Sequence, residues 1–213
     1  MLKVRLVCGR RRWVLIGLLL IVMISVQSAA RTASEPSTSD QAGPAGTTAS
    51  TAREEVAVHE DRRLGVKFNC PKTWRVVHSR ADLLVLEAGH ADDLVLIRKT
   101  MLHAKVNAAN VSDFRTVTDG ILGDPKANLG VLDTGAVQVG DLPGVFYLYT
   151  FPFKSGRGMQ AQYFVFKGRD LYTLVFQTGR AKRFAALAPS FDIVLETFGP
   201  TDTLESPKES RSK

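Results

Sequence analysis

Residues 142–177 decide the fold, and their three apolar segments read LPGVFYLYTFPF (142–153), QAQYFVF (160–166) and LYTLVFQ (171–177). A glycine-containing turn at residues 154–158 separates the first two segments, and Gly168-Arg169-Asp170 separates the last two. Runs of aromatic and β-branched residues between turns are typical of antiparallel strands. Both faces of these strands are apolar, so the sheet needs a layer on each side. Gly168 suits the first central position of a two-residue hairpin turn, because it tolerates positive φ.

The chain on either side of this stretch supplies the remaining elements. Alternating apolar residues predict strands, joined as an antiparallel meander, at residues 64–68, 74–78, 83–88 and 94–102, and a later strand at residues 129–139. Pro71 and Lys72 are expected to turn the chain between the first two of these strands. Together with the two helices described next, these strands predict an α+β domain in which helices enclose an antiparallel sheet, an α/β/α sandwich.

Two helices are expected, each with one apolar face. Ser112 or Asp113 caps the first, whose apolar face ends at Leu122 before Gly123 and Pro125. The second carries one stripe and contains Pro189, which predicts a kink or a break into two helices. The residues of that stripe are Phe184, Leu187, Ala188, Phe191, Val194, Leu195 and Phe198.

The N-terminal region has the pattern of an export signal. A cationic start is followed by the apolar run Val14–Val26 and by Ser28-Ala29-Ala30, which matches the three parts of a signal peptide. We expect residues 1–30 to be a signal peptide or an uncleaved membrane anchor, with membrane association through residues 14–26. Residues 31–55, rich in Ser, Thr, Ala and Pro, predict a disordered linker, and residues 200–213 a disordered tail. The folded domain is then residues 56–199.

Charge and cysteine content narrow the classes of function. The formal net charge is +7, but five of the 28 basic residues precede residue 31, and without them the balance is about +2. A nucleic-acid-binding protein keeps its basic residues in the folded domain, so we expect no nucleic-acid partner. Cys70 is alone once Cys8 is cleaved away, and its position before Pro71 favours a small buried side chain.

The order of elements resembles the PsbP-like family, named for the extrinsic subunit of the photosystem II oxygen-evolving complex. The resemblance rests on turn and packing signatures, namely Leu64 to Trp74, Leu142-Pro143-Gly144, Lys167 to Phe176 and Phe191 to Phe198. It implies an antiparallel sheet sandwiched by helices. It also implies a non-enzymatic assembly, chaperone or binding role, and it transfers no functional residue to this chain.

No catalytic or cofactor motif stands out. The sequence has no G-x-S-x-G, no phosphate-binding loop and no dinucleotide fingerprint, so we expect no catalytic residue, no cofactor and no enzyme. Two loops, His59-Glu60-Asp61 and His90-x-Asp92-Asp93, place an imidazole near carboxylates without a zinc-type spacing. We assign no metal site to them. The aromatic residues of the central strands are interpreted as core, with a ligand pocket as the alternative.

One group of charges is the candidate for partner binding. Five basic residues at the ends of the central elements form a predicted basic rim: Lys154, Arg157, Arg180, Lys182 and Arg183. Positive charge at a helix start opposes the helix dipole, which is the reason to single out this group. Such a rim would bind an acidic protein or lipid head groups.

These observations predict an extracytoplasmic protein, secreted or periplasmic and possibly anchored by its N-terminus. We expect a non-enzymatic binding or accessory role, of the assembly or chaperone kind, with a protein partner at or near the membrane. The alternative is an extracytoplasmic carrier of a small ligand or metal, using the His/Asp loops or a pocket between sheet and helix.

Overall fold

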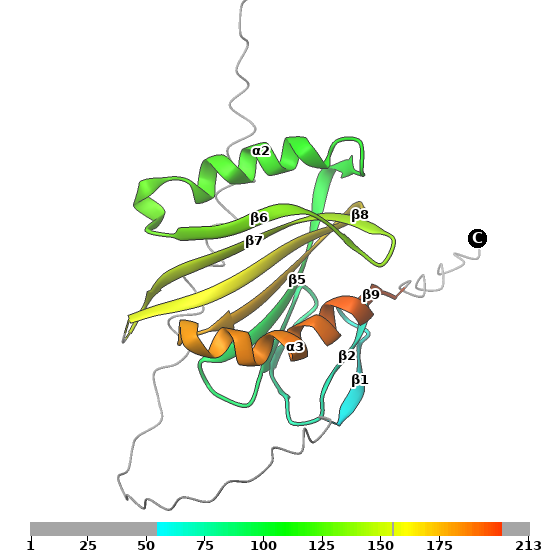
Figure 1. Cartoon of the computed structure of the whole chain (residues 1–213). Coiled ribbons are helices and arrows are strands. Elements are labelled where there is room, and N and C mark those ends of the chain that lie inside the picture. Colours follow the sequence, from blue (N-terminus) through cyan, green and yellow to red (C-terminus); the bar gives the residue numbers. More distant parts are fainter. Residues whose placement is uncertain (1–54, 155, 202–213) are drawn as a thin grey trace, which may run out of the picture. The chain divides into compact units, whose positions relative to one another are not determined.

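The computed structural model describes residues 55–154 and 156–201 (Figure 1). The predicted signal peptide or anchor, nearly all of the linker and nearly all of the tail lie outside these residues, so the proposed domain boundaries stay predictions. In the described part of the chain, no helix is long and apolar enough to cross a membrane.

The described residues form two antiparallel sheets. The small sheet has the order β1-β2-β9, from β1 (Val56–Asp61), β2 (Val66–Pro71) and β9 (Gly199–Pro200). The large sheet has the order β3-β4-β5-β8-β7-β6. Its strands are β3 (Arg75–Ser79), β4 (Leu83–Glu87), β5 (Asp93–Val106), β6 (Gly130–Val139), β7 (Leu142–Phe153) and β8 (Gly156–Thr178).

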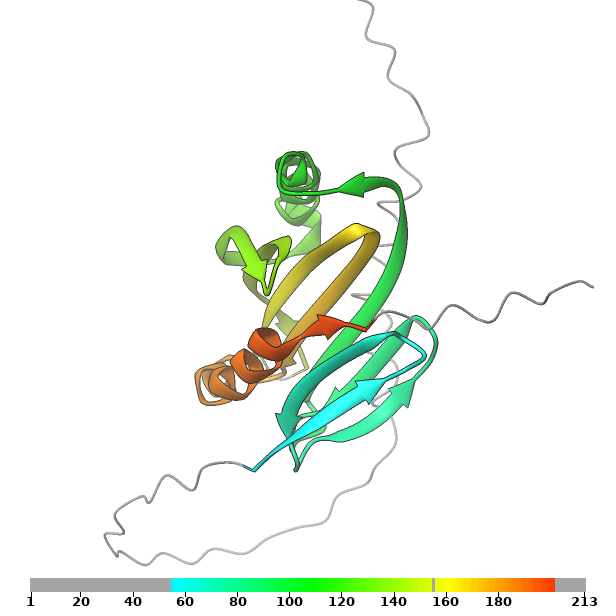
Figure 2. The same cartoon turned by 90° about the vertical axis from the view of Figure 1, so that its right-hand side faces the viewer.

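The β8 segment folds back on itself and fills two adjacent places in the large sheet. Residues 156–165 pair with β7, and residues 168–178 pair with β5. The rings of Tyr163 and Phe176 lie 5.8 Å apart, which a single extended strand does not allow. The pairing partner changes between residues 165 and 168, and Gly168 has a φ of +64°, which suits a turn. Figure 2 shows the two arms of β8 side by side. The hairpin predicted at this glycine is confirmed.

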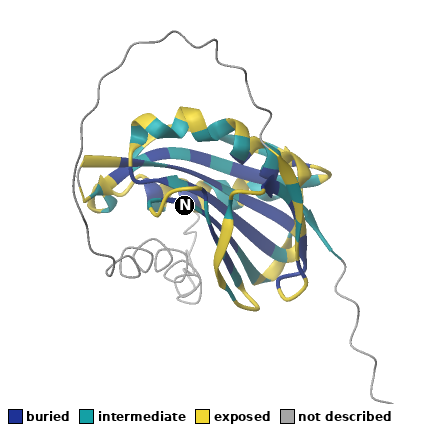
Figure 3. Ribbon diagram, turned by 90° about the horizontal axis from the view of Figure 1, so that it is seen from below, coloured by how far each residue is buried: buried dark blue, intermediate teal, exposed yellow. Residues whose placement is uncertain are grey.

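In the described part of the chain, the two longer helices pack against the large sheet through aromatic side chains. α2 (Val111–Leu122) places Phe114 against Phe164 and Phe166, at ring distances of 5.2 and 4.8 Å. α3 (Ala181–Thr197) places Phe191 against Phe176, at 4.9 Å. A short 3-10 helix, η1 (Pro125–Ala127), follows α2. Figure 3 shows the central strands as buried and the helices as only partly so.

The small sheet shares its core with α3 and one face of the large sheet. Val66 and Phe68 of β2 and Leu84 and Leu86 of β4 belong to one buried cluster with Phe191 of α3. A second sheet therefore covers part of the face that helices alone were expected to cover. The α+β class is confirmed, whereas the single meander is wrong, because β2 pairs with β1 and β9 rather than with β3.

Four local expectations also differ. Pro71 ends β2, paired with Val56, so only Lys72 is left to start the turn. α2 begins at Val111, and its N-cap is Asn110 rather than Ser112 or Asp113; the Asn110 side chain bonds to Asn107 and Lys105 instead. Of the two alternatives predicted at Pro189, the break into two helices is wrong, because α3 is one helix from Ala181 to Thr197, and the kink stays a prediction. Its predicted stripe extends one residue too far, since Phe198 is the C-cap, although its side chain is buried.

Candidate interaction surface

The basic rim lies at one end of the large sheet, where the β7–β8 turn meets the start of α3. Gly179, just before α3, has no room for a side chain because the Phe153 ring occupies that space. A Cβ atom at Gly158 of β8 would likewise collide with the Phe151 ring and with the Thr178 carbonyl oxygen, which would be 2.8 Å away. The two chain segments that carry the rim residues are thus packed against each other.

Two of the five rim residues are tied to specific partners. The Arg157 guanidinium donates to the Thr150 hydroxyl, from Nε at 3.0 Å and Nη2 at 2.9 Å, and to the Thr150 carbonyl at 3.1 Å. Arg183 Nη2 lies 2.7 Å from Asp93 Oδ2. At this distance the two charges form an ion pair.

The other three rim residues leave their charge at the surface. The Lys154 ammonium lies 5.9 Å from the Phe153 ring centre, and the residue is exposed. Arg180 and Lys182 are exposed, and within residues 55–154 and 156–201 neither forms a side-chain hydrogen bond or ion pair. The first turn of α3 contains no acidic residue and receives no side-chain cap. The charges of Arg180 and Lys182 are therefore uncompensated at this helix start, whereas Arg183 is paired with Asp93.

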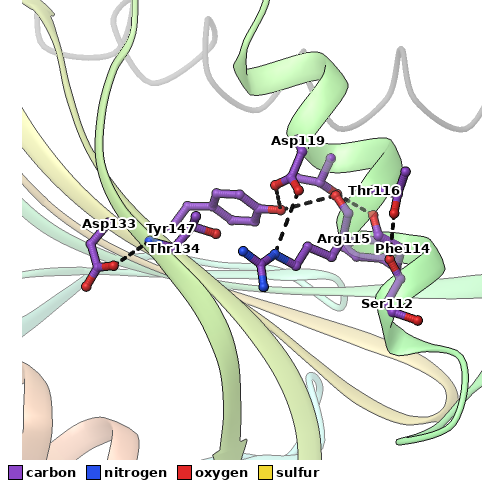
Figure 4. Close-up of polar contacts among 9 residues, drawn as sticks. Ser112, Phe114, Arg115, Thr116, Asp119, Asp133, Thr134 and Tyr147 are labelled. Carbon is purple, nitrogen blue, oxygen red and sulfur yellow. Dashed lines mark hydrogen bonds and ion pairs between the residues drawn. The ribbon is translucent and has the colours of Figure 1, made fainter.

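A polar cluster joins α2 to β7 on the other side of the sheet (Figure 4). The Tyr147 hydroxyl donates to Asp119 Oδ1 at 2.7 Å, and Arg115 Nε lies 3.7 Å from Asp119 Oδ2. Burial raises the pKa of Tyr147 well above its ordinary range, and the Asp119 carboxylate raises it further. Tyr147 therefore stays protonated and acts as a donor that holds the helix.

The central strands also carry a buried polar cluster that sequence reasoning had treated as plain core. Tyr149 Oη donates to Gln162 Oε1 at 2.8 Å. Gln160 Nε2 donates to Tyr149 Oη and, at 3.2 Å, to Gln162 Oε1. The signal was present in the sequence, since Gln160 and Gln162 alternate with apolar residues and so face the same side.

The His/Asp loops do not assemble into a metal centre in the part of the chain that the structure describes, where no three His, Cys, Asp or Glu side chains lie together. Asp61 Oδ1 accepts from the N–H groups of Arg63 and Leu64, both at 2.9 Å, and Oδ2 accepts from the Ser79 hydroxyl at 2.9 Å. Burial would raise the pKa of Asp61, but these hydrogen bonds outweigh it, and the pKa is lowered. The Asp61 carboxylate therefore stabilises the turn that follows β1.

A pocket lies between α3 and the large sheet. We call it the aromatic groove; its volume is about 120 Å³. The residues of the sheet in its wall are Phe146, Leu148, Ala161, Tyr163 and Phe176, and those of α3 are Phe184, Ala188, Phe191, Asp192 and Leu195. Its single charged residue is Asp192.

Comparison with solved structures places this arrangement among known folds. The structure is similar to cyanobacterial PsbP (CyanoP) from Synechocystis sp. PCC 6803, with a TM-score of 0.52 and 14% identity, over 74% of this chain and 99% of that one. The fold is PsbP-like. No protein-family model and no curated protein matches the sequence.

Two further solved structures are similar at TM-scores below 0.5. The Ran-binding protein Mog1p of Saccharomyces cerevisiae has a TM-score of 0.49 and 10% identity, over 70% of this chain and 97% of that one. LpqN of Mycobacterium tuberculosis, described as involved in cell envelope biogenesis, has a TM-score of 0.46 and 17% identity, over 75% and 100%. At these identities, the PsbP-like fold is what the comparisons establish.

Proposed function

We propose that this PsbP-like chain is an exported, non-enzymatic binding or accessory protein, of the assembly or chaperone kind, which acts on an acidic protein partner at or near the membrane. The observation that carries the proposal is the basic rim. Two separate chain segments are packed together at one end of the sheet, and three of their charges are left facing solvent. The signal-like N-terminal sequence supports the extracytoplasmic location.

The layering of the fold fits this use of the rim. In our proposal α2 and α3 serve as the outer layers of an α/β/α arrangement, because Phe114 and Phe191 pack on opposite faces of the sheet. The helices and the small sheet then cover the two faces of the large sheet. The ends of its strands stay accessible to a partner. Loops at the ends of a rigid sheet are a common place for binding residues.

Affinity capture tests the proposal. The tagged full chain is expressed in its native host, cross-linked and recovered from the membrane fraction, and bound proteins are identified by mass spectrometry. We expect a reproducible acidic partner that is lost when Lys154, Arg180 and Lys182 are all changed to Glu. The matched control changes Arg62, Arg63 and Lys67, three exposed basic residues around the β1–β2 turn, to Glu, and should keep the partner.

Two results would count against this function. One is equal capture by the rim variant and the control variant. The other is binding of the wild type to anionic vesicles without any protein, lost in the rim variant, because that result would assign the rim to lipid head groups.

A further inference from the structure

The aromatic groove lies on the face of the sheet that α3 covers. Phe146 and Tyr163, neighbours on β7 and β8, stack with ring centres 5.9 Å apart and planes at 26°. Phe184 of α3 contacts Phe191 at 5.6 Å, and Phe191 contacts Phe176 on the sheet at 4.9 Å. Phe176 and Phe191 are buried, while Phe146, Tyr163 and Phe184 are half-exposed. The groove thus has aromatic rings on both walls and remains reachable from solvent.

Asp192 gives the groove a negative charge. It is exposed on α3, and in residues 55–154 and 156–201 its carboxylate makes no hydrogen bond or ion pair. It is near enough to Tyr163 to raise the pKa of that phenol, an effect that adds to the larger one of burial. The rest of the lining is apolar. A lone carboxylate beside aromatic faces attracts a cation and offers nothing to an anion.

The size of the groove limits its occupant. Sites for drug-sized molecules are usually about 300–1,000 Å³. A volume of about 120 Å³ accepts one side chain of a partner rather than a whole small molecule of that class. The occupant must combine an apolar or flat body with a positive charge. Arginine suits this better than lysine, because its planar guanidinium is weakly hydrated and stacks on aromatic faces.

We propose that the aromatic groove binds an arginine side chain presented by a partner polypeptide, with the guanidinium against Phe146, Tyr163 and Phe184 and its charge toward Asp192. This inference rests on the proposed function in one respect, because it assumes a protein partner. It concerns a different surface and the opposite charge from the basic rim. The expected partner therefore carries an arginine for the aromatic groove in addition to acidic groups for the basic rim.

An NMR titration of the isotope-labelled full chain tests the anchor directly. The probe is a flexible peptide, Gly-Ser-Gly-Arg-Gly-Ser-Gly, and the matched peptide carries citrulline, which has the same shape without the charge. We expect saturable shifts of the backbone amides of Tyr163, Ala188 and Asp192. The citrulline peptide should bind at least about fivefold more weakly, since it loses both the cation–π contact and the charge pair.

Variants identify the residues responsible. Asp192→Asn should weaken binding of the arginine peptide about two- to fivefold. It should also reduce the ratio between the affinities for the arginine and citrulline peptides. Glu196→Gln, one turn further along α3 and outside the groove, should change neither. Phe184→Leu should weaken binding of the arginine peptide. The melting temperature of this variant serves as the control that its fold is intact. Equal binding of the two peptides, or an unchanged ratio in Asp192→Asn, would overturn the proposal, as would no saturation by about 10 mM, beyond the range of a weak specific contact.

The outcomes separate this proposal from the proposed function. Free arginine that binds as tightly as the peptide would make the occupant a small guanidinium compound and overturn the polypeptide claim. If the peptides fail while capture through the rim succeeds, the groove proposal alone is wrong. If the peptides bind while no partner is captured, the rim proposal is the one that fails.

Discussion

Asp93 connects the start of β5 to the segment where β8 ends and α3 begins. Its buried carboxylate accepts from the Thr178 hydroxyl at 2.7 Å and pairs with Arg183 at 2.7 Å. Asp93→Ala should lower the free energy of unfolding by about 2 kcal/mol, because Thr178 loses its acceptor inside the protein while Arg183 stays partly solvated. Urea unfolding measures this. The same change at the neighbouring Asp92 should cost less than about 0.5 kcal/mol; equal costs would contradict the role assigned to Asp93.

His59 should make stability depend on pH. Burial lowers its pKa below 6.5, although the Asp61 carboxylate partly offsets the effect. The folded state therefore binds fewer protons than the unfolded state as pH falls through about 6.5, and stability decreases with acidification down to the folded pKa. Asp61 acts in a lower range, since its lowered pKa supplies stability that is lost as pH falls below about 4.

Melting temperatures between pH 7.5 and 5 measure the contribution of His59. His59→Gln should flatten the dependence, whereas His78→Gln, at an exposed position, should leave it unchanged. A slope that survives in His59→Gln would show that another group titrates in this range.

Among the elements, the hairpin within β8 depends on one backbone conformation. Gly168 has φ +64° with open space around it, so Gly168→Ala meets no contact but pays for the left-handed conformation, about 1 kcal/mol. Gly120 also has open space but lies within α2, where alanine is preferred, so Gly120→Ala should raise stability by about 0.5–1 kcal/mol. Chemical unfolding should therefore show a lower free energy of unfolding for Gly168→Ala and a higher one for Gly120→Ala. If both variants are more stable than the wild type, the turn does not depend on Gly168.

Strands and helices whose apolar residues face the core could be predicted from the sequence. Elements in which apolar residues face solvent could not. The β8 hairpin shows alternation on both sides of a glycine. β1 was missed because Val56 and Val58 face solvent while His59 and Asp61 turn inward, so its pattern is the inverse of a normal strand. Without β1, the sequence offered no reason to assign β2 to a second sheet.

The candidate sites show the same division. Charge at the ends of elements identified the rim residues, but Thr150 and Asp93, which engage Arg157 and Arg183, are set by strand register and cannot be found by local reasoning. Likewise the aromatic residues of the groove were visible as a group. Which of these rings are buried and which are half-buried depends on where α3 packs, and the sequence does not show this.

At the scale of the whole molecule, charge is nearly balanced outside the first 30 residues, so attraction to an acidic partner must come from local groups. Raising salt from about 0.05 to 0.5 M shortens the screening length to a few ångströms. The partner's association rate with the wild type should fall steeply over this range, and that of the rim variant should already be low and change little. Stopped-flow or surface binding kinetics measures this, and an unchanged wild-type rate would argue against electrostatic recognition.

Cys70 makes the small sheet a reporter of its own opening. The thiol is 6% exposed on β2, opposite Ala57 of β1, and burial raises its pKa. A thiol-specific reagent therefore has to wait until the small sheet opens away from the buried cluster that contains Cys70. In a chain without Cys8, the labelling rate would report these openings, and its change when a partner is bound would tell whether binding stabilises the small sheet.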